Sequence, residues 1–200
     1  MSTAHSFLNG VRVGFALTGS FCTFDIAYTC MTDLVARGAQ VQPLLSPAAA
    51  ATQTRFNTPD EVFATLQTIT GRAPFTTLTE AEPIGPKKLL DVLLILPATG
   101  NTLAKLAAGI ADTAVTMAAK SHLRNDRPVV LAVSSNDALS NGAKNIGALL
   151  NARNIFFVPF GQDAPEEKPR SAVFHAGQVL PTLEAALRGQ QVQPILRSKE

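Results

Sequence analysis

The chain has little charge, few aromatic side chains and almost no cysteine among its 200 residues. Charged residues make up 16% of it, where about 25% is usual in soluble proteins, and tryptophan is absent. The formal net charge is +2 and no basic stripe is present, which argues against a nucleic-acid-binding protein. Because so few charges are available for the surface, we expect part of it to be covered in a homo-oligomer.

Long hydrophobic runs are also missing. No apolar run approaches the roughly 20 residues of a membrane span, and the first residues lack the charged and hydrophobic regions of a secretory leader. Cys22 and Cys30 are expected on one helix, too far apart to form a disulfide, which is typical of reduced cytosolic thiols. With the scattered His5, His122 and His175 they give no zinc-ligand spacing. We therefore expect a soluble, cytoplasmic protein without a bound metal.

Short apolar runs alternate with amphipathic segments along the chain, a pattern typical of βαβ units with a parallel sheet. The runs predict strands at residues 11–17, 41–45, 89–96, 129–133 and 155–158, the last strand of the chain, with a short edge strand at 74–78. The amphipathic segments predict helices at residues 20–37, 58–71, 102–110, 113–123, 137–151 and 177–188. Thr58, Pro59 and Glu61 mark one helix start with a capping box and a proline at the first position.

These elements predict one α/β domain over residues 1–200, a three-layer Rossmann-like or flavodoxin-like sandwich with a central, mostly parallel sheet. The segment at 89–96 is almost uniformly apolar, as a central strand buried on both faces requires. The tail from about residue 189 is expected to be extended and to pack on a sheet edge or on a neighbouring protomer.

Hydroxyl-rich loops follow four of the predicted strands and make the strongest functional signal. Where a strand opens into a helix, free backbone N–H groups and the helix dipole attract phosphate. Ligands of open α/β sheets bind beyond the carboxyl ends of the strands, where such loops meet. The residues expected to bind a cofactor are Thr18, Gly19, Ser20, Ser46, Thr99, Gly100, Asn101, Thr102, Ser134, Ser135 and Asn136.

The spacing of these loops narrows the kind of phosphate ligand. A P-loop needs Gly-Lys-Ser/Thr, but Gly19 is followed by Ser20 and Phe21, so no lysine reaches a β- or γ-phosphate. A dinucleotide fingerprint needs other glycines and an acidic residue after the second strand, which ends at Ser46. A single terminal phosphate, as in FMN, fits hydroxyl and N–H donors without a metal. Tight turns that bind no ligand are the alternative.

At these loops the chain resembles a flavoprotein family, that of the homo-oligomeric flavin-containing cysteine decarboxylases and flavin prenyltransferases, whose hallmarks are T-G-[SG] and P-A-S-A-N-T-like loops. The resemblance covers nearly the whole chain and is carried by residues 14–20, 81–86, 97–106, 122–130, 134–137, 156–163 and 193–196. It is greatest for one branch, which takes part in oxidising dihydrodipicolinate to dipicolinate during sporulation, beside a dehydrogenase-like partner.

The resemblance implies FMN as cofactor, a trimer-based assembly with the flavin at an interface between protomers, and an oxidoreductase activity. A nicotinamide, NAD(P), held by the partner is the other hydride acceptor that it leaves open. A non-catalytic chain that regulates or assembles the partner is one alternative function, and a flavin-dependent decarboxylase is another. Against the decarboxylase, Thr99-Gly100 stand where that group has Ser-Ala, and Arg55-Phe56 stand where its histidine is expected.

The catalytic residues are not identified by the sequence, but a substrate with two carboxylates needs cations. Arg55 and Lys105 are the candidates closest to the predicted binding loops. His122 is a candidate acid or base, with a helix cap as its simpler role, and Asp137 is expected to cap its helix. Three further cations, for which a solvated helix end is the simpler role, are Lys120, Arg124 and Arg127.

Overall fold

The sheet and its layers match the predicted sandwich. The computed structural model describes residues 7–198, so His5 lies outside the described part. Its sheet has the strand order β2-β1-β3-β4-β7-β6, and β5 pairs with the first half of β4. The parallel strands are β1 (Arg12–Leu17), β2 (Gln40–Leu45), β3 (Val92–Ala98), β4 (Val129–Ser135) and β5 (Ile155–Phe157). The prediction of an α/β fold with a mostly parallel sheet is confirmed.

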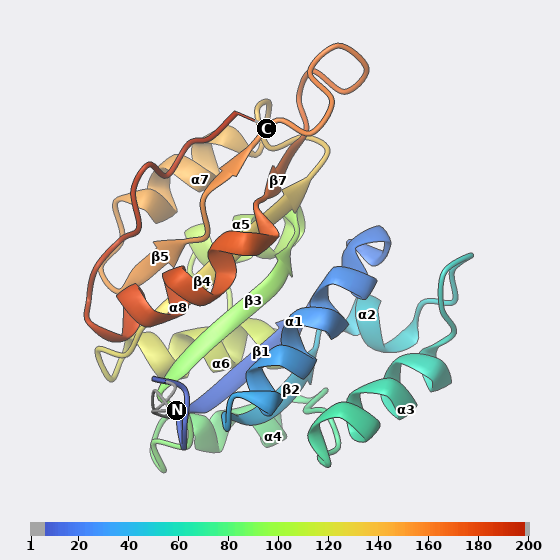
Figure 1. Cartoon of the computed structure of the whole chain (residues 1–200), viewed down its shortest axis with the longest axis vertical. Helices are drawn as coiled ribbons and strands as arrows, with labels where there is room; N and C mark the ends of the chain where they lie inside the picture. The colour runs from blue at the N-terminus through green and yellow to red at the C-terminus, as the bar shows by residue number, and fades with distance from the viewer. Residues whose placement is uncertain (1–6, 199–200) are drawn as a thin grey trace, which may run out of the picture.

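Helices cover both faces of the sheet (Figure 1). One face carries α1 (Phe24–Ala36), α3 (Pro59–Thr70) and α8 (Val179–Leu187). The other face carries α4 (Leu78–Ala81), α5 (Gly100–Ala107), α6 (Ala114–Leu123) and α7 (Ala143–Leu150). The short helix α2 (Pro47–Ala51) follows β2, and the 3-10 turns are η1 (Phe21–Thr23), η2 (Glu82–Ile84) and η3 (Ala176–Gln178).

Alternate residues of the strands form two separate hydrophobic cores, because successive side chains of a strand point to opposite faces. Leu94 of β3 belongs to the core beneath α1 and α8, and its neighbour Ile95 belongs to the core beneath α5 and α6. All seven residues of β3 are buried, as expected for a central parallel strand. Because the strand side chains fill these two cores, polar side chains lie mainly at the strand ends and in the loops.

The predicted helix boundaries hold where a capping residue marks them. Thr58 Oγ1 accepts a hydrogen bond from the Glu61 amide (3.3 Å), and the Glu61 side chain accepts one from the Thr58 amide (2.7 Å). Gly71, with φ of 69°, ends this helix in the left-handed conformation that glycine adopts without strain. Thr113 caps α6 with a box of the same kind, whereas Thr99 caps α5, which runs from Gly100 to Ala107 and not over the predicted residues 102–110. Cys22 lies in the turn η1 and Cys30 in α1, and both are free thiols.

Two predicted elements are wrong in type or extent. Residues 74–78 form no strand beyond a single bridge between Phe75 and Leu44, because Thr77 caps α4 and turns the chain away from the sheet. The helix expected at 137–151 begins only at Ala143, because residues 137–142 form consecutive turns in a Ser-Asn-Gly context. Asp137 therefore does not cap this helix.

Residues 155–158 are not the last strand of the chain. The antiparallel strands β6 (Phe160–Gly161) and β7 (Ala172–Phe174) follow, and β7 pairs with Ser134 and Ser135 at the end of β4. The loop between β6 and β7 projects from the sheet as the free tip in Figure 1. This hairpin brings residues 160–174 to the carboxyl edge of the sheet.

The C-terminal segment runs along the free edges of β5 and β6 (Figure 1). The Gln191 side chain accepts from the Phe157 amide (2.7 Å) and donates to the Phe157 carbonyl (2.7 Å). The Phe160 amide donates to the Ile195 carbonyl (3.0 Å), and the Arg197 amide donates to the Phe160 carbonyl (3.0 Å). The tail thus satisfies backbone groups of an edge that would otherwise be open. Between residues 7 and 198, no helix has the length and apolar character needed to cross a membrane.

Candidate functional site

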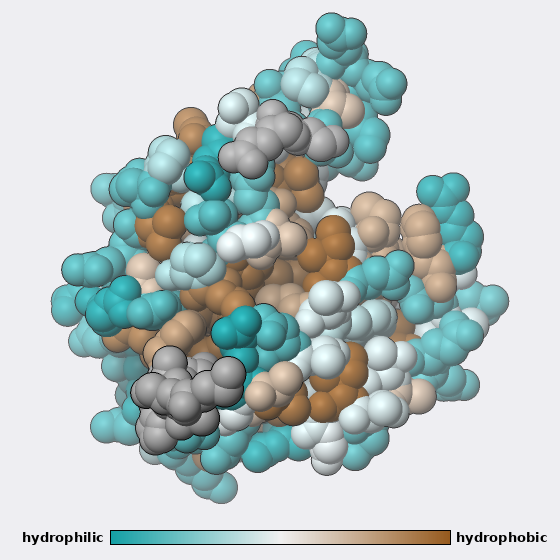
Figure 2. Space-filling view, in the orientation of Figure 1, coloured by the Kyte–Doolittle hydropathy of each residue, from teal (hydrophilic) through white to brown (hydrophobic). Residues whose placement is uncertain are grey.

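A cavity of about 260 Å³ opens at the carboxyl edge of the sheet, where four segments of the chain meet. The segments are the β1–α1 loop, the start of α5, the end of β4 and the β6–β7 hairpin. In Figure 2 the outline of the molecule is notched beside the projecting hairpin. The lining residues are Gly19, Ser20, Cys22, Thr23, Thr99, Gly100, Ser134, Ser135, Asn136, Asp163, Lys168, Ser171, Ala172 and Val173. Seven of the predicted binding residues are therefore in one place.

Thr18 joins the first two loops from beneath the cavity. Its side chain is only 1% exposed, and its hydroxyl donates to the Pro97 carbonyl (2.7 Å) while accepting from the Thr99 amide (3.2 Å). This pair of bonds ties the end of β1 to the end of β3. The hydroxyl of Thr18 is occupied by the protein, so its function is to position the neighbouring loop residues.

Ser20 and Ser134 lie side by side in the cavity lining, just beyond β1 and near the end of β4. Their hydroxyl oxygens are 2.8 Å apart and share a hydrogen bond. Two hydroxyls carry two protons, and this bond uses one of them, so the other O–H can serve a ligand. The Ser20 amide instead donates to the Thr18 carbonyl (2.8 Å). The side chain of Ser20, not its amide, is the group that faces outward for binding.

The start of α5 supplies backbone donors. Thr99 Oγ1 accepts from the Thr102 amide (3.5 Å) and contacts the Thr102 hydroxyl (3.2 Å), which fixes the first turn. Gly100 and Asn101 occupy the first two helical positions, whose N–H groups point out of a helix without an intrahelical acceptor. A Cβ on Gly100 would lie 2.9 Å from Asp137 Oδ1 and 3.0 Å from Ser135 Oγ, so a side chain there would crowd the cavity wall. The helix start is thus open to an anion.

The hairpin contributes the only ion pair among the described residues that line the cavity. Lys168 Nζ lies 3.7 Å from Asp163 Oδ2. Burial raises the pKa of Asp163, but the hydrogen bond from Ser171 and the charge of Lys168 outweigh it and hold the pKa below its ordinary value. Neither residue is among the predicted site residues, because the antiparallel return of the chain after residue 158 was not predicted. The sequence did carry a signal for the loop between β6 and β7. Gly161 is followed by two prolines and several charged residues, which are typical of a loop.

Four of the other predicted site residues lie outside the cavity lining. Ser46 is buried, and its hydroxyl accepts from the Ala49 amide (3.2 Å) as the cap of α2. Thr102 is buried inside the first turn of α5, and Asn101 is exposed beside it. Arg55 stacks over the Phe56 ring at 4.8 Å, in the segment between α2 and α3.

The lysine and histidine proposed as catalytic candidates are also engaged elsewhere. Lys105 Nζ contacts both carboxylate oxygens of Asp112, at 2.9 and 2.7 Å. This ion pair lowers the pKa of Asp112. His122 is 1% exposed at the end of α6, next to the residues that precede β3 and β4. It therefore lies at the amino edge of the sheet, opposite the cavity.

The amino edge holds a dense polar cluster around Asp91. The Asp91 carboxylate accepts from Arg12 Nη2 (2.6 Å), Arg12 Nε (3.0 Å), the Arg12 amide (2.9 Å) and Arg127 Nη1 (3.2 Å). The hydrogen bonds from Arg12 hold the pKa of Asp91 below its ordinary range, against burial. Burial and the nearby Arg127 charge lower the pKa of His122 to about 4, so its imidazole is neutral at neutral pH. This cluster ties β1, β3 and β4 together.

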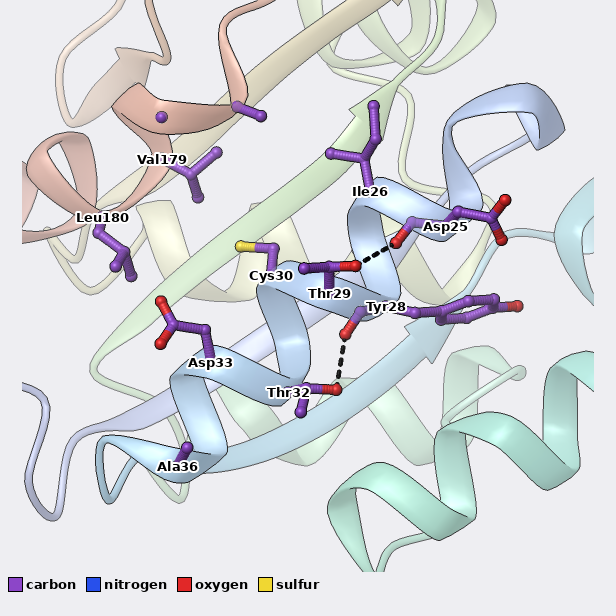
Figure 3. Close-up of a pocket in the computed structure, with 12 residues that line it drawn as sticks. Asp25, Ile26, Tyr28, Thr29, Cys30, Thr32, Asp33, Ala36, Val179 and Leu180 are labelled. Atoms are coloured by element: carbon purple, nitrogen blue, oxygen red, sulfur yellow. Dashed lines mark hydrogen bonds between the residues drawn. The ribbon is translucent and has the colours of Figure 1, made fainter.

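A larger hollow of about 1050 Å³ lies between α1 and α8. Figure 3 shows Cys30 of α1 projecting towards Val179 and Leu180 of α8, with Ile26 at the upper end of the groove. Its walls are mostly apolar, and burial raises the pKa of Cys30 to about 12, so the thiol stays protonated. A phosphate site needs several polar donors that point to one place and the start of a helix. The smaller cavity at the carboxyl edge has both features, so we take it, and not the larger groove between α1 and α8, as the candidate phosphate site.

Comparison with known proteins identifies relatives over nearly the full length. The model of the flavoprotein family matches residues 1–173, which include every residue that lines the cavity. The B subunit of dipicolinate synthase from Bacillus subtilis (strain 168) is 44% identical over 191 residues, which cover 96% of each chain. The crystal structure of the B subunit of dipicolinate synthase from Bacillus halodurans has a TM-score of 0.88 at 43% identity, over 96% of this chain and 99% of that chain. The FMN-dependent cysteine decarboxylase SpaF shares the fold, with a TM-score of 0.65 at 23% identity over 90% of this chain and 98% of that chain.

Proposed function

The chain belongs to the flavoprotein family, and we propose that it binds FMN in the carboxyl-edge cavity and takes part in oxidising dihydrodipicolinate to dipicolinate. The observation that carries this proposal is the convergence of three hydroxyl-rich loops and a helix start on one cavity. The identity of 44% to the B subunit of a dipicolinate synthase supports the choice of substrate.

The donor set of the cavity fits a phosphomonoester. The free hydroxyl proton of the Ser20–Ser134 pair and the N–H group of Gly100 would hold the phosphate, with the positive end of the α5 dipole behind it. Ala172 and Val173 supply an apolar wall for a ring. At about 260 Å³ the cavity is smaller than the roughly 300–1,000 Å³ of most drug-sized ligand sites. We therefore propose that a second copy of the chain covers the rest of the flavin.

The reaction removes a hydride and a proton from a dihydropyridine ring, which becomes aromatic. A bound flavin supplies the hydride acceptor, and the protein's contribution is binding and orientation. Cys22, Asp163 and Lys168 are the titratable side chains among the described residues that line the cavity. No histidine is in that set, and we assign His122 to the stability of the fold.

The relatives are each named as one of the subunits of a synthase, which supports a second, different chain as partner. We propose that this partner is the dehydrogenase-like A subunit of dipicolinate synthase, and that NAD(P) held by it is the alternative acceptor of the hydride. The absence of a histidine from the described cavity lining also supports a second candidate function, in which this chain regulates or assembles the dehydrogenase-like partner without turning over substrate.

A titration with two flavins tests the cofactor. The purified chain is titrated with FMN and with riboflavin, and quenching of flavin fluorescence is followed. We expect FMN to bind at least about tenfold more tightly, because only FMN offers a phosphate to the hydroxyl and N–H donors. Equal affinities would contradict the phosphate site.

A reconstitution tests the role. The dehydrogenase-like partner is mixed with dihydrodipicolinate, with this chain in its FMN-bound and FMN-free forms, and dipicolinate formation is measured. We expect the rate to depend on FMN. A full rate with the flavin-free chain would favour the assembly role, and a full rate from the dehydrogenase-like partner alone would contradict both roles.

A further inference from the structure

One cation of the cavity has no role in the flavin site, and it lies on the hairpin. Lys168 belongs to the loop between β6 and β7, and it is the one lysine or arginine among the described residues of the lining. We propose that Lys168 binds a carboxylate group of the substrate and so determines specificity for an anionic ring compound. This inference rests on the proposed function and adds a residue to it.

The main chain of Lys168 is held in place from both sides. Its amide donates to the Ala164 carbonyl (2.7 Å), and its carbonyl accepts from the Ser171 amide (3.0 Å). Gln162 Nε2 donates to the next carbonyl, that of Pro169 (3.0 Å). The loop is tied to the β4–α7 segment as well, since the Leu139 amide donates to the Arg170 carbonyl (2.9 Å). A fixed main chain carries the lysine stem to the cavity without the cost of ordering a free loop.

The ammonium group, by contrast, is only loosely held. The Lys168 side chain is 55% exposed, and its Nζ is 3.7 Å from Asp163, beyond the usual hydrogen-bond distance of about 2.7–3.2 Å. An exposed pair of this kind contributes little to stability and is readily exchanged for another anion. Asp163 has a second partner in Ser171, so its carboxylate stays bonded if Lys168 turns towards a ligand.

Three of the other candidate cations are engaged within the protein, and neither Lys120 nor Arg124 lines the cavity. Lys105 is bonded to both oxygens of Asp112, and Arg127 contacts Asp91 at 3.2 Å on the far edge. Arg55 lies over the Phe56 ring. A substrate carboxylate needs a cation that can leave its present partner and that borders the same cavity as the ring. Lys168 meets both conditions.

Lys168 could bind either of two oxyanions, the phosphate of FMN or a carboxylate of the substrate. The groups that surround each oxyanion distinguish the two. The hydroxyl and N–H donors at Ser20, Ser134 and Gly100 already suit the phosphate. The lysine belongs to a different segment of the lining, the loop of the hairpin that also carries the apolar Ala172 and Val173. We therefore assign it to the substrate.

The test compares a charged ligand with a neutral one of the same shape. Binding of pyridine-2,6-dicarboxylate and of pyridine-2,6-dicarboxamide to the full chain is measured by calorimetry, with and without FMN. Lys168→Gln should weaken dicarboxylate binding about tenfold and leave dicarboxamide binding unchanged, because only the carboxylate loses a charge-assisted contact. Lys168→Arg should keep most of the affinity. Lys144→Gln, on the exposed side of α7, is the matched control and should bind as the wild type does.

Two results would overturn the assignment. One is an equal loss of affinity for both pyridine ligands, which would make the effect of Lys168 structural. The other is a loss of FMN affinity in Lys168→Gln with riboflavin affinity unchanged, which would assign the lysine to the phosphate. If the wild type binds no flavin while Lys168→Gln still discriminates against the dicarboxylate, the flavin proposal fails and the lysine assignment stands.

Discussion

The two edges of the sheet differ in how their polar groups are paired. At the amino edge, the Asp91 carboxylate accepts from Arg12 and Arg127, and the strands are tied together by these bonds. At the carboxyl edge, hydroxyl groups of Ser20 and Ser134 bond to small neighbours and border an open cavity. Ion pairs hold the strands together at the amino edge, whereas hydroxyl and N–H donors at the carboxyl edge border a cavity.

This difference separates stability from function along the same strands. Loops beyond strand ends are where binding groups accumulate, because a rigid sheet positions them. A cluster whose bonds are made within the protein has nothing left for a ligand, whereas a helix start with free N–H groups does. Substitutions at the amino edge should therefore change the free energy of unfolding, and substitutions at the carboxyl edge should change ligand affinity.

The largest expected effect is a loss of stability in acid that depends on His122. The unfolded chain protonates this histidine near its ordinary pKa of 6.5, but the folded chain does so only near about 4. Protons therefore favour the unfolded state as the pH falls from 6.5 to about 4, and the stabilisation present above 6.5 is lost over that window. The gap corresponds to about 3 kcal/mol. Urea unfolding between about pH 7 and pH 4.5 measures most of it.

A second variant isolates the histidine from the carboxylates. His122→Gln should lose much of this pH dependence while keeping its FMN affinity at neutral pH. The contribution of Asp91, whose pKa is lowered below the ordinary 3.8, is present above 3.8 and is lost only at more acidic pH, so it does not overlap. Parallel pH profiles for the wild type and His122→Gln would contradict the account of the amino edge.

The next largest effect is expected when a negative charge is introduced into the cavity. Ser20→Glu should weaken FMN binding about a hundredfold, because a carboxylate would stand against the phosphate. Its free energy of unfolding should stay close to that of the wild type, since Ser20 is only partly buried. Ser20→Ala, the matched control without charge, should lose about tenfold in affinity, as expected for one hydrogen bond to a charged phosphate. Equal FMN affinities of the glutamate and alanine variants in a fluorescence titration would remove Ser20 from the site.

A smaller effect is expected when a side chain is added at Gly100, at the start of α5. Gly100→Ala would bring a methyl group to 2.9 Å from Asp137 Oδ1, and the wall must shift to admit it. We expect FMN affinity to fall about tenfold without a loss of stability, because alanine favours a helix over glycine. Gly147→Ala on α7 meets no atom within 4 Å and should stabilise the fold by about 0.5–1 kcal/mol with unchanged binding. Unchanged FMN affinity in both variants would contradict a ligand at the helix start.

The smallest effect is expected for Lys105. Its ammonium is bonded to Asp112 outside the cavity lining, so Lys105→Gln should bind FMN and dipicolinate as the wild type does. Calorimetric titration of both ligands measures this. A selective loss of dipicolinate binding would return Lys105 to the site and would show that the α5–α6 loop moves when ligand binds.

Local signals in the sequence predicted most of the fold. Apolar runs identified β1 to β5, and Thr58 and Thr113 marked helix starts, because burial and capping are decided within a few residues. The loops at Gly19, Gly100 and Ser134 were placed in the predicted site for the same reason, and the structure brings them together.

What the sequence left out depends on contacts between distant residues. Strands β6 and β7 have two and three residues, too few for a periodic pattern, and β7 exists through its pairing with Ser134 and Ser135. Asp163 and Lys168 were missed with that hairpin. His122 lies on a correctly predicted helix, and because that helix leads into the parallel strand β4, its end lies at the amino edge, which was the available signal against a place in the cavity.

The position of bound FMN tests the central claim most directly. A crystal structure of the chain with FMN should show the phosphate among Ser20, Gly100 and Ser134 at the carboxyl edge, with Lys168 free to face the substrate side. Flavin bound instead in the larger groove between α1 and α8, or a phosphate with no contact to these three residues, would contradict the account.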